Sequence, residues 1–222
     1  MTPSLEYEFR LAAEGADLIA GIDEAGRGCW AGPVVAAAVI LKPEVYANPN
    51  LLAGINDSKQ LSATQRDSAF ERVQACALGI GVGIIPAYLI DAFGIVPATK
   101  MAMSSAIFSL PMLPKALLID AVKLKELPFR QESIIRGDST SLSIAAASII
   151  AKVTRDRLMQ SASRAYPDYG FEQHKGYGTA QHQTALNRFG PCEIHRFTFQ
   201  PVANTRLSKF GLSAKILTEH SG

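Results

Sequence analysis

The hydrophobic pattern of the chain begins with two apolar runs that flank a short polar and glycine-rich segment. Residues 18–22 form the first run, and Val34–Leu41 is an uninterrupted run rich in β-branched residues. Short continuous apolar runs bounded by turn residues are typical of strands buried in a sheet. The pattern therefore predicts two buried strands, with Asp23 and Glu24 at the exit of the first.

Further along the chain, helical periodicity alternates with short apolar runs. Ser62 is a suitable N-cap for a helix over residues 62–77, and residues 79–85 form a third strand-like run. Three consecutive strands followed by alternating helices and strands predict an α/β fold in which helices flank a mixed sheet. The remaining elements that the pattern predicts are helices over residues 86–93, 96–110, 137–161 and 208–218 and strands over residues 116–120 and 132–136.

The composition is that of an ordinary domain with a sizeable core. The chain has 222 residues, of which 48% are apolar and 19% charged. We expect one domain, with an α/β core over about residues 17–162 and a C-terminal segment over about residues 163–222 that completes a substrate cleft. The sequence shows no basic-then-apolar leader and no apolar run of the ~18 residues that a membrane span needs. We therefore expect a cytoplasmic protein.

Charge is distributed unevenly between the two halves of the chain. Residues 1–120 hold 8 Lys and Arg against 12 Asp and Glu, a net of −4, whereas residues 121–222 hold 14 against 8, a net of +6. An acidic half with candidate metal ligands and a basic half that could hold a polyanion suit a phosphodiesterase. The three cysteines have no CxxC spacing, which favours reduced thiols.

Asp23 and Glu24 are adjacent carboxylates at the end of a buried strand, where burial is costly unless a cation neutralises them. Successive side chains of a regular strand point to opposite faces, so both could reach one ion only if the strand breaks at Glu24. Gly26 and Gly28 could supply that break, and Arg27 between them suits a phosphate. The alternative interpretation is an acidic hairpin turn with a surface arginine.

Two further acids end predicted elements. Asp120 ends an apolar strand, where it could also be a turn former, and Asp138 precedes Ser139 at a predicted helix start, where an N-cap is the ordinary role. Four acids at strand and helix ends are what a two-metal phosphoryl-transfer site requires, with two divalent ions about 3.5–4 Å apart.

The helix predicted after Asp138 carries a polar stripe beside its apolar arc. With 100° of rotation per residue, the residues of this stripe fall within about one-sixth of the helix circumference. Such a stripe is either a solvated face or a set of substrate contacts. It consists of Ser141, Ser148, Lys152 and Arg155.

These segments make the chain similar to bacterial ribonuclease HII, a type 2 ribonuclease H. The resemblance extends over residues 18–202, with the motifs in the family's order. They are GIDEAGRG, AGPVVAAAVIL, DSKQLS, LLID, RGDSTSLSIAAASIIAKVTRDR, YPDYGFEQHKGYGT and GPCEIHRFTF.

The resemblance implies a ribonuclease H-like fold and an endoribonuclease that hydrolyses the RNA strand of RNA–DNA hybrids. It also implies cleavage 5′ to ribonucleotides embedded in duplex DNA, with 3′-hydroxyl and 5′-phosphate ends, and two Mg²⁺ or Mn²⁺ ions per site. We expect a monomer with no membrane contact. The implied residues are Asp23, Glu24, Asp120 and Asp138 as metal ligands, Gly26, Arg27 and Gly28 at the ribonucleotide, Tyr177 at the RNA–DNA junction, and Lys59 and Lys152 at phosphates.

The sequence departs from the family's usual pattern at a few positions. Cys29 and Trp30 stand where proline and an aliphatic residue are usual, Arg136 where lysine is common, and Ala121 where glycine is common. An alanine forced to positive φ would cost about 1 kcal/mol. Either the turn after Asp120 therefore stays in the ordinary region of φ, or it carries modest strain.

Three other functions share part of this pattern. Gly26-x-Gly28-x-x-Ala31 imitates a dinucleotide-binding fingerprint, but it leads into a strand-like run where that fingerprint must open a helix. A non-catalytic nucleic-acid-binding module would not explain four acids that repel phosphate. A DNA-directed metal nuclease of the same fold is the nearer alternative. The histidines lack metal-ligand spacing, and we expect His174, His182 and His195 to hold the C-terminal segment together or to contact phosphate.

Overall fold

The computed structural model describes residues 2–55 and 61–209, and within them five strands form one mixed sheet. The strand order is β3-β2-β1-β4-β5. β1 pairs antiparallel with β2 and parallel with β4, so the sheet changes direction at its central strand. The strands are β1 (Ile19–Ala25), β2 (Val34–Leu41), β3 (Ala77–Ile85), β4 (Ala116–Asp120) and β5 (Arg130–Ile134). The predicted α/β sheet is confirmed.

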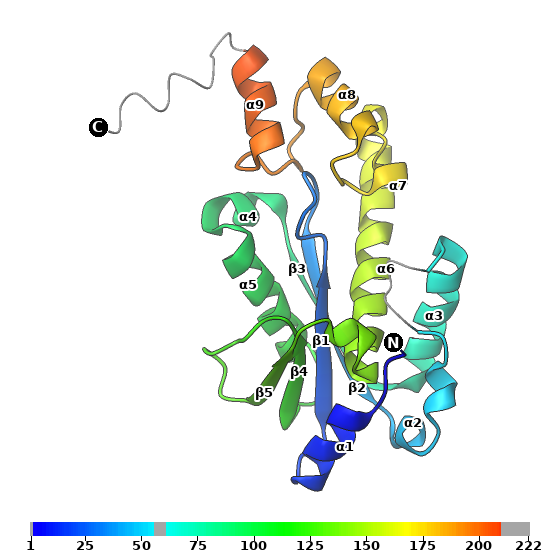
Figure 1. The fold of residues 1–222 in the computed structure, drawn as a ribbon. Coiled ribbons are helices and arrows are strands. Elements are labelled where there is room, and N and C mark those ends of the chain that lie inside the picture. The colour runs from blue at the N-terminus through cyan, green and yellow to red at the C-terminus, as the bar shows by residue number, and fades with distance from the viewer. Residues whose placement is uncertain (1, 56–60, 210–222) are drawn as a thin grey trace.

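Helices cover both faces of the sheet (Figure 1). α4 (Ala87–Phe93) and α5 (Ile95–Phe108) lie on one face, and α3 (Ala63–Cys76) and α6 (Leu142–Ala165) lie on the other. Glycines in β3 let α5 approach closely, because a β-carbon at Gly83 would overlap the carbonyl oxygen of Ala102. The sheet is therefore buried between two helical layers.

The remaining elements lie at the two ends of the sheet. α1 (Glu6–Ala13) packs at the end where β1 begins, whereas the C-terminal helices lie beyond the end where β1 leads into β2 (Figure 1). The other described elements are α2 (Pro43–Ala47), α7 (Phe171–His174), α8 (Ala180–Phe189), α9 (Gln200–Lys209) and the 3₁₀ turns Pro49–Leu52, Gly137–Ser139 and Pro167–Tyr169.

Several predicted boundaries needed correction. The helix after Ser62 is confirmed, with a capping box in which Gln65 is the partner. The last long helix was placed too early, because α6 begins at Leu142 with Ser141 as its N-cap. Asp138 is thus not a helix cap; it lies in the preceding 3₁₀ turn. The expected helix over residues 208–218 lies mostly outside the described residues.

The structure also shows the state of the cysteines and the length and polarity of the helices. All three cysteines are free thiols, as expected. Within residues 2–55 and 61–209, every helix is too short or too polar to cross a bilayer.

Candidate active site

Three of the predicted carboxylates lie on segments that meet at one end of the sheet. Gly21 pairs with Leu118 and Ile22 with Ile119, so Asp23 and Asp120 follow in adjacent parallel strands. The backbone N–H of Gly137 donates a hydrogen bond of 2.7 Å to Oδ1 of Asp120, which ties the turn that carries Asp138 to β4. The sequence expectation that these acids are neighbours therefore agrees with the fold.

Glu24 does not lie where the strand breaks. β1 stays paired with β2 through Ala25, and the break follows at Gly26, whose φ is +92°. Ile22 packs in the core cluster with α5 and Ala25 in the cluster with α6, so alternation places Glu24 on the α5 face and Asp23 on the α6 face. The predicted break at Glu24 is wrong, because glycine at positive φ turns the chain two residues later.

Burial and like charges dominate the electrostatics of this end of the sheet. Asp23 is only 4% exposed, and its pKa is raised well above the ordinary value by burial and then by the charges of Glu24 and Asp120. Hydrogen bonds from Ser148 and from the N–H of Glu24 oppose that shift. A carboxylate in this position is stabilised by a nearby cation.

The donor chemistry suits a divalent ion, but the ligands are not assembled around one point. Carboxylate oxygens are the ligands that Mg²⁺ and Mn²⁺ prefer. Among the described residues, however, no three histidine, cysteine or acidic side chains are grouped closely enough to hold a metal. Glu24 accepts a hydrogen bond of 3.1 Å from Arg27, and Asp120 accepts one from Gly137. An ion would compete with these two partners.

A cavity of about 330 Å³ opens beside Glu24. It brings together the glycine loop from one end of the sheet, the polar stripe of α6 and Tyr177 from the C-terminal segment. Its lining consists of Glu24, Ala25, Gly26, Arg27, Gly28, Ser148, Lys152 and Tyr177. Most of the residues that the sequence assigned to substrate therefore share one cavity.

Two buried arginines fix the backbone of residues 26–33, which form the loop between β1 and β2. Arg155 donates to the carbonyl oxygens of Pro33, Lys175 and Ala31 at 2.9–3.0 Å. Arg196 donates to the carbonyl oxygens of Gly26, Arg27 and Gly32. Burial lowers the pKa of Arg196 to about 10, so the guanidinium stays charged at neutral pH. The sequence analysis missed Arg196, although an arginine in GPCEIHRFTF was visible.

Tyr177 lies in a turn that packs directly on this loop. The N–H of Trp30 donates to the carbonyl oxygen of Gly176 at 2.8 Å, and a β-carbon at Gly178 would overlap the Trp30 ring. The Tyr177 hydroxyl hydrogen-bonds with the Cys29 thiol, and burial raises its pKa to about 12. At neutral pH the phenol is therefore protonated and able to donate a hydrogen bond.

Buried neutral histidines hydrogen-bond the backbone of the turn that carries Tyr177. His182 Nδ1 donates to the carbonyl oxygen of Tyr177 at 3.0 Å, and His174 Nδ1 accepts from the N–H of Gly176 at 3.1 Å. His195 Nδ1 accepts from the N–H of Cys192, so its Nε2 carries the proton that bonds to His182. Burial lowers the pKa of His182 and His195 to about 4. The expectation that these histidines hold the C-terminal segment together is confirmed.

Comparison with known proteins places this site in a family. The sequence model of the family described as Ribonuclease HII matches residues 20–202. The chain belongs to the ribonuclease HII family. It is 59% identical to ribonuclease HII of Chloroflexus aurantiacus over 94% of this chain and 98% of that relative, and 61% identical to that of Chloroflexus aggregans over 91% and 95%. As a ribonuclease HII it is an endoribonuclease, a hydrolase that acts on RNA–DNA hybrids.

Solved structures of the family agree with the fold. Ribonuclease H2 of Pyrococcus horikoshii is 25% identical with a TM-score of 0.68 over 88% of this chain and all of that one. Ribonuclease HII of Archaeoglobus fulgidus, solved in complex with PCNA, is 26% identical with a TM-score of 0.70 over 85% and 96%. The ribonuclease H-like mixed sheet with a helical C-terminal segment is therefore confirmed.

Two of the expected substrate contacts of this ribonuclease HII have another role in the structure. Ser141 and Arg155 are fully buried, and each is hydrogen-bonded within the protein. The helical projection placed them correctly on one face, but it could not show that the ends of that face are covered by α1 and by the loop between β1 and β2. Lys59 lies outside the described residues.

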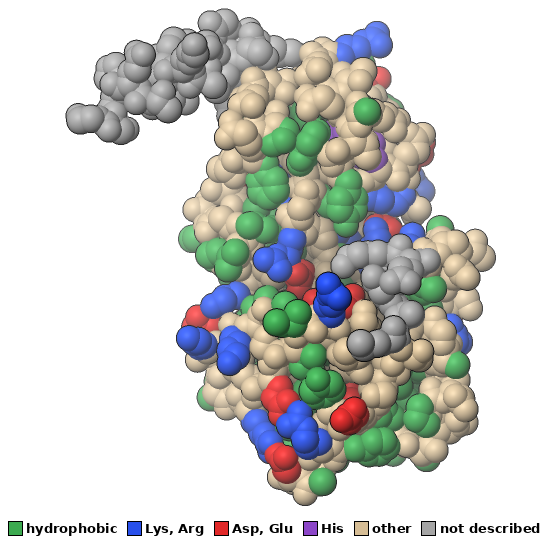
Figure 2. All heavy atoms as spheres, viewed as in Figure 1, with side chains coloured by type: hydrophobic (Ala, Val, Ile, Leu, Met, Phe, Trp, Pro, Cys, Tyr) green, Lys and Arg blue, Asp and Glu red, His purple; other side chains and the backbone are tan. Residues whose placement is uncertain are grey.

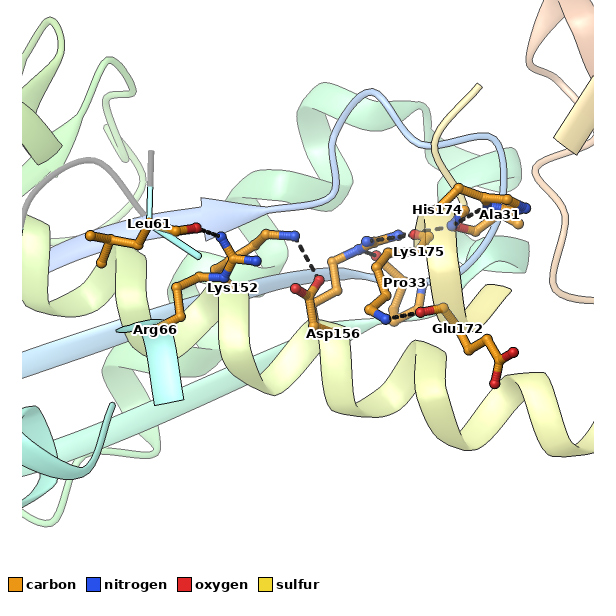
Figure 3. Close-up of polar contacts among 11 residues, drawn as sticks. Ala31, Pro33, Leu61, Arg66, Lys152, Asp156, Glu172, His174 and Lys175 are labelled. Atoms are coloured by element: carbon orange, nitrogen blue, oxygen red, sulfur yellow. Dashed lines mark hydrogen bonds and ion pairs between the residues drawn. The ribbon is translucent and has the colours of Figure 1, made fainter. Parts of the chain in front are cut away.

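A second and larger groove adjoins the cavity. It measures about 830 Å³ between α3, α6 and α7, and it shares Lys152 and Tyr177 with the cavity. Figure 2 shows basic side chains beside acidic ones in the middle of the face that it draws. Lys152 is paired with Asp156 at 2.7 Å, as Figure 3 shows, and burial lowers its pKa. The cations that line the groove are Arg66, Lys152, Arg157 and Lys175.

Proposed function

We propose that this enzyme cuts the phosphodiester bond 5′ to ribonucleotides in hybrids and in duplex DNA, and leaves 3′-hydroxyl and 5′-phosphate ends. The observation that carries the proposal is the cavity of about 330 Å³, in which the loop of Gly26, Arg27 and Gly28 meets Tyr177 beside Glu24. That arrangement supplies a close backbone approach and an aromatic ring at one point, which is what reading one nucleotide requires.

The four carboxylates Asp23, Glu24, Asp120 and Asp138 are proposed as ligands for two divalent ions, Mg²⁺ or Mn²⁺. Bound there, the ions would activate a water molecule and stabilise the departing 3′-oxygen. Burial raises the pKa of Asp23, and repulsion from Glu24 and Asp120 raises it further. A cation would offset both effects, which supports this role. Ser148 holds the Asp23 carboxyl by a hydrogen bond and so orients it.

The loop between β1 and β2 is proposed to test the 2′-hydroxyl group. A β-carbon at Gly28 would have no other atom within 4 Å, so a ribose can approach the backbone of Gly28 closely. At Gly26 the corresponding space is filled by the Arg155 side chain, so glycine there lets Arg155 pack against the loop. Arg196 donates hydrogen bonds to the carbonyl oxygens of Gly26 and Arg27 and so keeps the loop rigid. These bonds do not use the backbone N–H groups of the loop. Arg27 is 43% exposed in its side chain and free to turn from Glu24 to a phosphate.

Tyr177 is proposed to recognise the junction between RNA and DNA. Tyr177 is 38% exposed and lines the cavity, and its hydroxyl group is protonated at neutral pH. The ring can stack on a sugar or base while the hydroxyl group donates to the ribonucleotide.

The groove between α3, α6 and α7 is proposed as the track for the duplex backbone. Because α7 belongs to the C-terminal segment, the same proposal lets that segment complete the substrate cleft, which stays a prediction from the sequence. Lys152 at the boundary of groove and cavity is the proposed phosphate contact nearest the carboxylates. Lys59 stays a proposed phosphate contact. A cytoplasmic and monomeric enzyme stays a prediction from the sequence.

The test uses three matched duplexes of one sequence: an RNA–DNA hybrid, a DNA duplex with a single ribonucleotide, and an all-DNA duplex. With Mg²⁺, we expect cleavage of the first two, with a single cut 5′ to the ribonucleotide in the second, and no cleavage of the third. Cleavage of the all-DNA duplex at a similar rate would instead favour the DNA-directed nuclease. Addition of a chelator should abolish both cleavages.

A further inference from the structure

The N-terminal segment, residues 4–8, lies against the turn that carries Asp138. Ser4 forms an isolated parallel bridge with Ser141: its N–H donates to the carbonyl oxygen of Thr140 and its carbonyl oxygen accepts from Leu142, each at 2.9 Å. This segment precedes residues 20–202, to which the family match extends. A part of the chain outside that match therefore contacts the segment that directly follows Asp138.

Glu8 is the strongest link between the segment and α6. It is fully buried, and its Oε1 accepts three hydrogen bonds, from the Ser141 hydroxyl at 2.7 Å, the Ser143 hydroxyl at 2.7 Å and the Ser143 N–H at 3.0 Å. A buried carboxyl group is costly unless it is hydrogen-bonded, and here all three donors belong to the first turn of α6 and its cap. The side chain is therefore held by the N-terminus of α6.

The same few residues connect Glu8 to the carboxylates. Ser141 N–H donates to the carbonyl oxygen of Gly137 at 2.8 Å, and Gly137 N–H donates to Asp120 at 2.7 Å. Asp138 lies between these two attachments, in a turn that Arg136 enters with a φ of +57°. A turn in that conformation persists only when its surroundings hold it. Glu8 supplies one side of that support, and Asp120 supplies the other.

We propose that Glu8 is a positioning residue for the hydrolysis, which sets the Asp138 turn through Ser141 and Ser143. The inference rests on the proposed role of Asp138 as a metal ligand. Groups that orient a metal ligand typically change metal affinity or activity by about 10- to 100-fold when they are removed. Glu8 does not reach the cavity, so its removal should leave the binding of the nucleic acid unchanged.

The test compares the parent with Glu8→Ala, Glu8→Gln and Glu6→Ala. Glu6 is an exposed acid of the same helix, so Glu6→Ala controls for the loss of charge and of a side chain from α1. Calorimetry without substrate measures Mn²⁺ binding, and steady-state kinetics on a hybrid measure kcat and KM. We expect Glu8→Ala to weaken Mn²⁺ binding by about 10-fold or more and to lower kcat with KM unchanged. Glu8→Gln keeps an acceptor oxygen for the serines and should recover most of the loss.

The outcomes separate this inference from the proposed function. If Glu8→Ala does not fold, Ser143→Ala removes one donor of the same link and should weaken Mn²⁺ binding in the same direction. Parental Mn²⁺ binding and kcat in Glu8→Ala, or in Ser143→Ala where the first is unfolded, would overturn the positioning role. Parental activity in Asp138→Asn would instead overturn the proposed role of Asp138 as a metal ligand.

Discussion

Nε2 of His195 donates a hydrogen bond to Nε2 of His182 across 3.0 Å. This bond needs one protonated and one unprotonated nitrogen, and the remaining nitrogen of His182 already donates to Tyr177. A proton added to His182 would therefore place two donors face to face. The turn that carries Tyr177 depends on neutral histidines.

Acidification should destabilise the protein through this pair. In the folded state, the pKa of both histidines is lowered from 6.5 to about 4, so the unfolded chain binds more protons between these values. The free energy of unfolding contributed by the pair is present above pH 6.5 and is lost as pH falls toward about 4. Thermal melts across this range should show a falling Tm, with a shallower fall in His182→Gln. Asp23, whose pKa is raised in the folded state, makes Tm rise on acidification, and it does so equally in the parent and in His182→Gln. The difference in Tm between these two proteins therefore reports His182 alone. Parallel curves would contradict the prediction.

Replacing Tyr177 should impair recognition of a single ribonucleotide. Loss of stacking on a nucleotide costs roughly 1–3 kcal/mol, so Tyr177→Ala should cleave the single-ribonucleotide duplex about 10- to 100-fold more slowly. Tyr177→Phe separates the ring from its hydroxyl group. Calorimetry should show unchanged Mn²⁺ binding in both variants. A parental cleavage rate in Tyr177→Ala would show that Tyr177 has a structural role and does not recognise the ribonucleotide.

Trp30, the only tryptophan, should report substrate binding. Its ring lies against Gly178 and its centroid is 5.4 Å from that of His182, next to the proposed junction reader. Titration with a single-ribonucleotide duplex in the presence of Ca²⁺, which should support binding without cleavage, should change the emission. An all-DNA duplex is the control. An unchanged spectrum at saturation would place the loop between β1 and β2 away from the bound strand.

Replacing Ala121 by glycine should stabilise the protein. Its φ is +49°, in the left-handed region where a β-carbon costs about 1 kcal/mol or more. Ala121→Gly removes that cost but gains freedom in the unfolded chain, so we expect a gain of up to about 1 kcal/mol in the free energy of unfolding. Ala92→Gly, in the exposed face of α4, should change it in the opposite direction. Chemical denaturation measures both, and a loss in Ala121→Gly would contradict the strain.

The sheet, the helix after Ser62 and the neighbourhood of the acids followed from local patterns, since apolar runs and caps act over a few residues. The sequence could not show that Ser141 and Arg155 are covered, because Glu8 and the loop between β1 and β2 that cover them are far away in the chain. Likewise, the break after Glu24 depended on which glycine adopts positive φ. The strain at Ala121 was one of two open alternatives, and the structure decided it.

Asp23, Glu24, Asp120 and Asp138 are proposed to form the divalent-metal site that performs the hydrolysis. The most direct measurement is the rate of hybrid cleavage against Mg²⁺ concentration in Asp23→Asn, Glu24→Gln, Asp120→Asn and Asp138→Asn. Asp17→Asn, an exposed acid paired with Lys115, is the matched control. Loss of several kcal/mol of transition-state stabilisation should lower the rate by at least about 100-fold in each site variant, with an unchanged or raised Tm, and leave the control at the parental rate. Full activity in any two folded site variants would contradict the account.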